Sequence, residues 1–132
     1  MMATVSKLQE IYNKYPEQLP KKVIKCEEGW FPIIEEMCST IQVYLSFDVT
    51  AKATPVTFTE IKEKYGVLNI SYEGGDPVIE RVIKHTQKIS YKTCEYCGEK
   101  GNLYCSTKWR SWSKLKTLCQ DHAVKFFYYR SH

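Results

Sequence analysis

Four side chains in the C-terminal third of the sequence have the types and the spacing of a metal site. Cys94 and Cys97 form a C-x-x-C pair, and after 21 intervening residues Cys119 and His122 form a C-x-x-H pair. Structural zinc is held tetrahedrally by four thiolate or imidazole ligands, and a tight C-x-x-C turn can direct two thiolates at one ion. Gly98 permits the positive φ angle that such a turn often needs. The pattern predicts one zinc ion bound by these four residues.

Other interpretations of the cysteines stay open. Cys105 lies between the two pairs and can replace His122 as the fourth ligand. A C-x-x-C pair can also be redox-active, although the βαβ context of that motif is missing, and the cysteines can simply be buried thiols. We expect Cys26 and Cys38 to be packed thiols. Four protein ligands would leave no position for water, so the zinc site is expected to stabilise structure and not to catalyse.

The stretch between the two ligand pairs is basic and aromatic, with the sequence K-W-R-S-W-S-K-L-K at 108–116. Cations interleaved with indoles can neutralise phosphates and stack on bases, which favours nucleic acid. Arg and Trp are equally typical of protein interfaces, and a third interpretation is a zinc-ribbon hairpin with solvated lysines. The candidate partner-binding residues are Lys108, Trp109, Arg110, Trp112, Lys114 and Lys116.

No further motif predicts catalysis. The adjacent glutamates at 27–28 and 35–36 would point in different directions on a helix, so they do not form an acid and base pair. The E-G-G-D sequence at 73–76 has no phosphate-loop lysine beside it, and no H-x-E accompanies the cysteines as in zinc deaminases. We therefore expect a protein that is not an enzyme.

Length and composition predict one soluble globular domain. The 132 residues are 43% hydrophobic and 26% charged, enough for one core but not for two. Without a signal peptide or an apolar run of about 18 residues, we expect a protein of the cytoplasm, with no membrane contact and with thiols that are reduced or bound to metal. Residues 1–66 carry 8 basic and 9 acidic side chains, whereas residues 67–132 carry 11 and 6, so an anionic partner would be drawn to the second half.

Helical periodicity dominates the first half of the chain. A short amphipathic helix is expected over Thr4–Tyr15, with Ser6 and Gln9 as a capping box. A second helix has Pro32 in its first turn, and residues 46–55 follow as a loop. The apolar stripe of that second helix consists of Trp30, Ile33, Ile34, Met37, Cys38, Ile41 and Leu45.

The second half mixes strand and helix signals. Residues 57–65 fit a short capped helix slightly better than a strand, and Val67–Tyr72 alternate as a strand does. Asp76 and Pro77 begin a helix that runs to Ser90, and a last helix is expected over Cys119–Arg130. These elements predict an α+β fold, a single small domain of about four helices and a small antiparallel sheet. Residues 1–91 would form the α+β core, and residues 92–132 a zinc-ribbon-like module packed on it.

Several motifs resemble a family of small phage and prophage proteins. They are G-W at 29–30, I-K-E-K-Y-G-V-L at 61–68, G-G-D at 74–76, C-E-Y-C-G at 94–98 and T-L-C-Q-D-H-A at 117–123, and together they cover about residues 28–124. The resemblance extends to a metalloprotein among the type II-A anti-CRISPR inhibitors. It implies the same four metal ligands and identifies no inhibitory residues. The chain departs from the pattern in the longer basic stretch 103–116, with its additional Cys105.

The resemblance implies a zinc-stabilised phage protein that works in the host bacterial cytoplasm. Such a protein would inhibit a bacterial defence nuclease, a type II CRISPR effector, by binding its protein surface and hindering the loading of target DNA. The alternative is a zinc-ribbon phage regulator that binds nucleic acid through residues 108–116.

Overall fold

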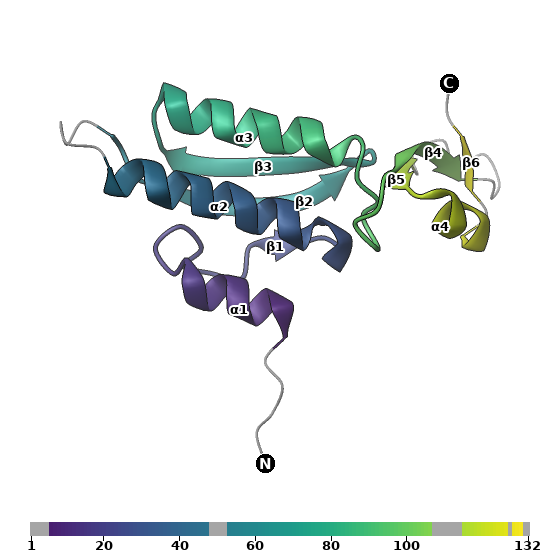
Figure 1. The fold of residues 1–132 in the computed structure, drawn as a ribbon, viewed down its shortest axis with the longest axis horizontal. Coiled ribbons are helices and arrows are strands. Elements are labelled where there is room, and N and C mark those ends of the chain that lie inside the picture. Colours follow the sequence, from purple (N-terminus) through teal and green to yellow (C-terminus); the bar gives the residue numbers. More distant parts are fainter. Residues whose placement is uncertain (1–5, 48–52, 107–114, 127, 131–132) are drawn as a thin grey trace, which may run out of the picture.

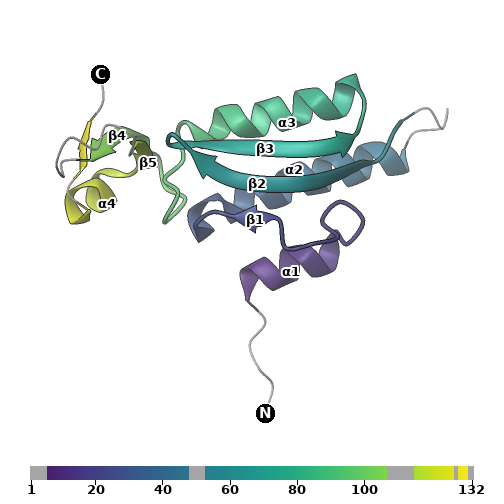
Figure 2. The ribbon, with the colours of Figure 1, turned by 180° about the vertical axis from the view of Figure 1, so that it is seen from behind.

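Two helices packed on one face of a three-stranded sheet form the larger part of the molecule (Figure 1). The computed structural model describes residues 6–47, 53–106, 115–126 and 128–130. The sheet has the order β1-β2-β3, with β1 at Ile24–Lys25, β2 at Val56–Lys64 and β3 at Val67–Gly74. Strand β1 runs parallel to β2, and β2 and β3 form an antiparallel hairpin. Seen from behind, β2 and β3 lie in front of α2 and α3, so no helix of the described residues covers their second face (Figure 2).

The helices of this larger part begin where the sequence predicts. Helix α1, Lys7–Lys14, has Ser6 as its N-cap, and the hydroxyl of Ser6 accepts from the Gln9 N–H. Helix α2, Phe31–Ser46, follows the short 3-10 turn η1, Glu28–Trp30. Helix α3, Pro77–Ser90, is capped by the Asp76 carboxylate, which accepts from two backbone N–H groups of the first turn. Such caps satisfy N–H groups that have no partner inside the helix.

Residues 57–64 belong to strand β2 and Tyr65 to the turn that follows, so the expectation of a short helix over 57–65 is wrong. Every buried side chain of β2 lies on the face that α2 and α3 cover, and a β-bulge between Phe58 and Glu60 keeps Ile61 on that face. The turn to β3 places Tyr65 and Gly66 at φ angles of 54° and 84°. Two successive residues with positive φ are typical of a tight hairpin turn, so hairpin pairing overrides the local helix signals.

The hydrophobic core lies between this sheet and its helices, and it includes the apolar stripe predicted for the second helix. Trp30, at the start of α2, is fully buried. The larger core side chains are Ile11, Ile34, Met37, Ile41, Phe58, Ile61, Leu68, Ile79 and Ile83.

A smaller part follows α3 and lies beside the turn between β2 and β3 (Figure 1). Its sheet has the order β5-β4-β6, with β4 at Asn102–Ser106, β5 at Leu115–Leu118 and β6 at Tyr128–Arg130, all antiparallel. Helix α4 spans only Gln120–Lys125. The predicted helix over Cys119–Arg130 is therefore too long, because the chain leaves α4 after one and a half turns to pair β6 with β4.

The fold class is α+β, a single domain with four α-helices and two small sheets in the part of the chain that the structure describes. Five residues of the predicted loop 46–55 and most of the basic stretch, 107–114, lie outside the described residues. Within the described ranges, no helix is both long enough and apolar enough to cross a bilayer.

Candidate metal centre

The four predicted ligands come from two short segments that the smaller part brings together. Cys94 and Cys97 lie on the tight turn that follows α3, closed by a bond from the Gly98 N–H to the Cys94 carbonyl. Gly98 has a φ angle of 80°, as the sequence predicts. Cys119 is the N-cap of α4, and His122 lies in its first turn.

The four candidate ligand atoms lie close enough together to surround one ion. All four lie within 4.8 Å of one another. Bonds of about 2.3 Å to sulfur and about 2.0 Å to nitrogen would place two sulfurs about 3.8 Å apart, and sulfur and nitrogen about 3.5 Å apart. The Sγ atoms of Cys97 and Cys119 are 3.7 Å apart, and His122 Nδ1 is 3.6 Å from Cys94 Sγ and 3.1 Å from Cys119 Sγ. The group can therefore hold a metal ion such as zinc.

Backbone N–H groups surround the sulfur of Cys94. Burial disfavours its thiolate, but N–H groups of Cys119, Cys97 and Tyr96 donate to the sulfur and lower its pKa overall. Cys97 is exposed, but the partial desolvation of its sulfur, together with the two neighbouring thiols, raises its pKa to about 11. Crowding of this kind disfavours several thiolates at one point, and a divalent cation among them would remove the penalty.

Two aromatic rings position the imidazole of His122. The ring of Tyr96 lies 5.8 Å from the imidazole and that of Phe126 lies 5.7 Å from it, both nearly parallel to it. Packed rings restrict the rotation of the histidine and keep Nδ1 directed at the sulfurs. Neither ring was predicted to contact the site, although Phe126 stands four residues after His122 and so shares its helix face.

The remaining cysteines lie outside this group. Cys105 is half-buried in β4 and does not belong to the cluster, so His122 is the fourth member. Cys38 is fully buried on the apolar face of α2, and Cys26 is half-buried. Burial raises the pKa of both thiols to about 12, in agreement with packed, unreactive cysteines.

The turn with the first two cysteines is seated directly on the start of α2. The indole N–H of Trp30 donates to the Thr93 carbonyl at 2.8 Å. A Cβ atom on Gly29 would lie 2.4 Å from the carbonyl oxygens of both Cys94 and Glu95, so only glycine fits there. The G-W pair at 29–30, whose tryptophan was predicted to belong to the apolar stripe of the second helix, also forms the contact surface for the ligand turn.

Of the candidate partner-binding residues, only Lys116 lies within the described part of the chain. Its ammonium group makes ion pairs with Glu63 Oε1 at 3.0 Å and with Glu95 Oε1 at 3.2 Å. Partial burial opposes its charge, but the two carboxylates raise its pKa overall. Lys116 is thus engaged inside the protein. Lys108, Trp109, Arg110, Trp112 and Lys114 lie outside the described residues.

Comparisons with known protein families, with curated proteins and with solved structures find no match to this chain. The four-residue cluster is therefore the feature from which a function must be argued.

Proposed function

We propose that the cluster of Cys94, Cys97, Cys119 and His122 holds a structural zinc ion in a non-enzymatic binding protein. The convergence of four soft or borderline ligand atoms within 4.8 Å of one another is the observation that carries the proposal. Four protein ligands fill the coordination sphere, so the ion would stabilise the fold and leave no site for a reactant. Zinc would stabilise the smaller part where its own core is small, because among its described residues the buried hydrophobic cluster has four members.

Zinc binding is tested by metal analysis of protein prepared without added metal. We expect one equivalent of zinc per chain, and Cys119→Ser should lose it and loosen the smaller part while the larger part remains folded. Cys105→Ser is the matched control, because this cysteine lies outside the cluster, and it should keep the ion. Substantially less than one equivalent in the wild type would refute the proposal.

We further propose that the protein is a phage inhibitor of a bacterial RNA-guided nuclease, as the sequence resemblance implies. Support for a protein-binding mode comes from a cleft of about 240 Å³ between α1 and the start of α2. Glu10, Glu28 and Glu35 line it together with one cation, Lys7, around an apolar floor that includes Ile11 and Phe31. Glu35 also pairs with Lys14, but the lining keeps an excess of negative charge. An acidic surface of this kind is complementary to the Lys- and Arg-rich channels that hold nucleic acid in such nucleases.

The partner is tested with a purified type II CRISPR effector loaded with guide RNA. We expect the protein to bind the effector and to reduce the loading of target DNA. The double variant Glu10→Lys/Glu28→Lys should weaken both effects, whereas Glu73→Lys, an exposed change on β3, should not. Absence of effector binding, or salt-sensitive binding to DNA or RNA alone, would count against the inhibitor and favour the regulator that binds nucleic acid.

A further inference from the structure

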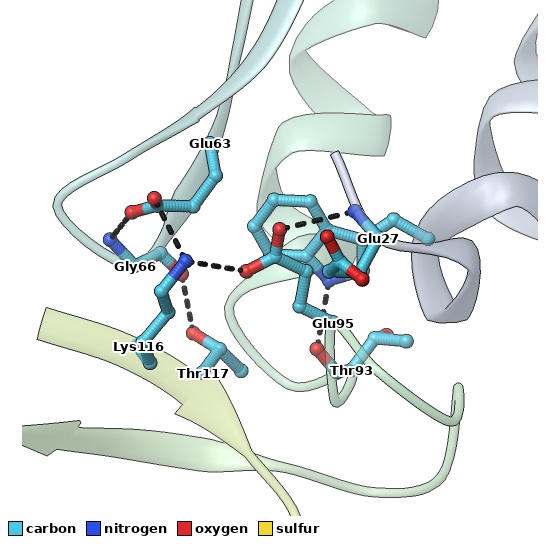
Figure 3. Close-up of polar contacts among 8 residues, drawn as sticks. Glu27, Glu63, Gly66, Thr93, Glu95, Lys116 and Thr117 are labelled. Atoms are coloured by element: carbon cyan, nitrogen blue, oxygen red, sulfur yellow. Dashed lines mark hydrogen bonds and ion pairs between the residues drawn. The ribbon is translucent and has the colours of Figure 1, made fainter. Parts of the chain in front are cut away.

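A cluster of three charged side chains joins the smaller part to the larger one (Figure 3). Lys116, on β5, lies between Glu63 on β2 and Glu95 on the turn that carries the first two cysteines. Lys116 and Glu63 are each about one-fifth exposed, and Glu95 is only 2% exposed. Ion pairs with so little solvent around them are screened weakly, so loss of one partner leaves a poorly solvated charge.

Glu95 belongs to both parts of the molecule. It stands between Cys94 and Cys97 in sequence, and its Oε2 accepts from the Glu27 N–H at 3.2 Å, just before α2. Its own N–H donates to the Thr117 carbonyl on β5 at 3.0 Å. The conformation of the ligand turn therefore decides where this carboxylate lies.

Glu63 is tied to the turn of the β2–β3 hairpin. Its Oε2 accepts from the Gly66 N–H at 2.7 Å, while its Oε1 pairs with Lys116 (Figure 3). The hydroxyl of Thr117 donates to the Gly66 carbonyl. One continuous set of polar contacts thus runs from the ligand turn through β5 to the hairpin of the larger part.

We propose that this cluster couples metal occupancy to the docking of the smaller part on the larger part. The inference rests on the proposed zinc site. Metal held by the four ligands keeps the ligand turn in the conformation that presents Glu95 to Lys116 and the Thr93 carbonyl to Trp30. Without metal the turn loses that restraint, and the contacts with the hairpin and with the start of α2 weaken together. Metal loss would then weaken the contacts that β2 makes with the smaller part, although β2 supplies no ligand.

Coupling between two sites is reciprocal, which gives a direct test. If metal favours docking by a certain factor, docking favours metal binding by that same factor, so a variant that docks poorly must bind metal more weakly, by up to that factor. Glu63→Gln removes one charge of the cluster without touching a ligand, and we expect its zinc affinity, measured by chelator competition, to fall at least about fivefold. Glu60→Gln lies on the same strand but pairs with the more exposed Lys25 and Lys62, so it should bind zinc like the wild type.

Equal zinc affinity in Glu63→Gln and the wild type would overturn the coupling and leave the zinc site intact. A wild type that binds no zinc would instead refute the proposed function. Circular dichroism confirms that each variant is folded. If Glu63→Gln does not fold, Thr117→Val replaces it, because it removes the hydroxyl contact with Gly66 and is expected to lower zinc affinity in the same direction.

The fluorescence of Trp30 gives a second readout, independent of affinity. The chain has three tryptophans, so Trp109→Phe/Trp112→Phe leaves Trp30 as the only one. Its indole is fully buried and bonded to the ligand turn. Removal of zinc with a chelator should shift its emission to longer wavelength, and zinc addition should reverse the shift. Unchanged emission on complete removal of the metal would overturn the proposal.

Discussion

The contact between Gly29 and the ligand turn predicts a large effect of adding one methyl group. Gly29 does not have a positive φ angle, so Gly29→Ala introduces no backbone strain of its own. The new Cβ would lie 2.4 Å from the carbonyl oxygens of Cys94 and Glu95 and 2.5 Å from the Glu95 carbonyl carbon. All three are backbone atoms, which cannot rotate away as a side chain does.

The size of the effect follows from these distances. Ordinary contact begins near 3.4 Å, so the two segments must separate by about 1 Å. Overpacking of this kind costs about 1–3 kcal/mol, and the rigid backbone on both sides places Gly29→Ala near 3 kcal/mol. For a domain of this size, that loss corresponds to a melting temperature lower by about 10 °C. Docking of the smaller part should weaken as well, because the separation opens the Trp30 contact.

Thermal unfolding of the zinc-loaded protein, followed by circular dichroism, measures the change. Glu28→Ala is the matched control, since its exposed side chain neighbours the same glycine, and its stability should change by less than about 0.5 kcal/mol. A Gly29→Ala variant that melts within about 1 °C of the wild type would refute the reasoning, because the ligand turn would then be free to move away from α2.

Two further predictions concern the larger part. Hydrogen bonds from the Ile79 N–H and the Tyr44 hydroxyl lower the pKa of Asp76, so its stabilising effect is present above the ordinary carboxyl value of 3.8 and is lost as pH falls through the lowered pKa. Acid unfolding below about pH 4 should therefore be steeper in the wild type than in Asp76→Asn, whose amide does not titrate, and identical profiles would contradict this assignment. Tyr65 has a φ angle of 54°, which asparagine adopts more readily, so Tyr65→Asn should raise the free energy of unfolding by about 0.5–1 kcal/mol in urea. A loss of stability would show that the tyrosine ring, which lies 5.8 Å from Lys64 Nζ, contributes more than the backbone preference.

The sequence predicted correctly those elements that depend on interactions between residues close together in the chain. Ser6, Asp76 and Pro77 mark helix starts because a cap or a fixed φ angle acts within one turn. The four residues of the candidate metal centre were identifiable for a related reason, since each pair lies within four residues and the chemistry of thiolate and imidazole is specific.

The features that the sequence did not predict depend on strand pairing and ion pairs between residues far apart in the chain. Residues 57–65 carry the marks of a capped helix, but pairing with β3 on one side and β1 on the other makes them the central strand. The end of the chain turns into β6 because β4, more than twenty residues earlier, offers a free edge. The ion pairs of Lys116 could not be predicted for the same reason, because Glu95 and Glu63 stand 21 and 53 residues away in the sequence.

The close contact between the ligand turn and Gly29 limits which substitutions homologues of this chain can accept. A cysteine motif that only binds metal tolerates many residues at its two inner positions. Here the first inner position is Glu95, whose carboxylate accepts hydrogen bonds from the Lys116 ammonium group and from the Glu27 N–H. Descendants of this chain should therefore change Glu95 and Lys116 together, and should keep Gly29 for as long as the backbone of the ligand turn lies against it. A homologue that keeps all four metal ligands yet has lost this trio would have to attach its C-terminal part by another route.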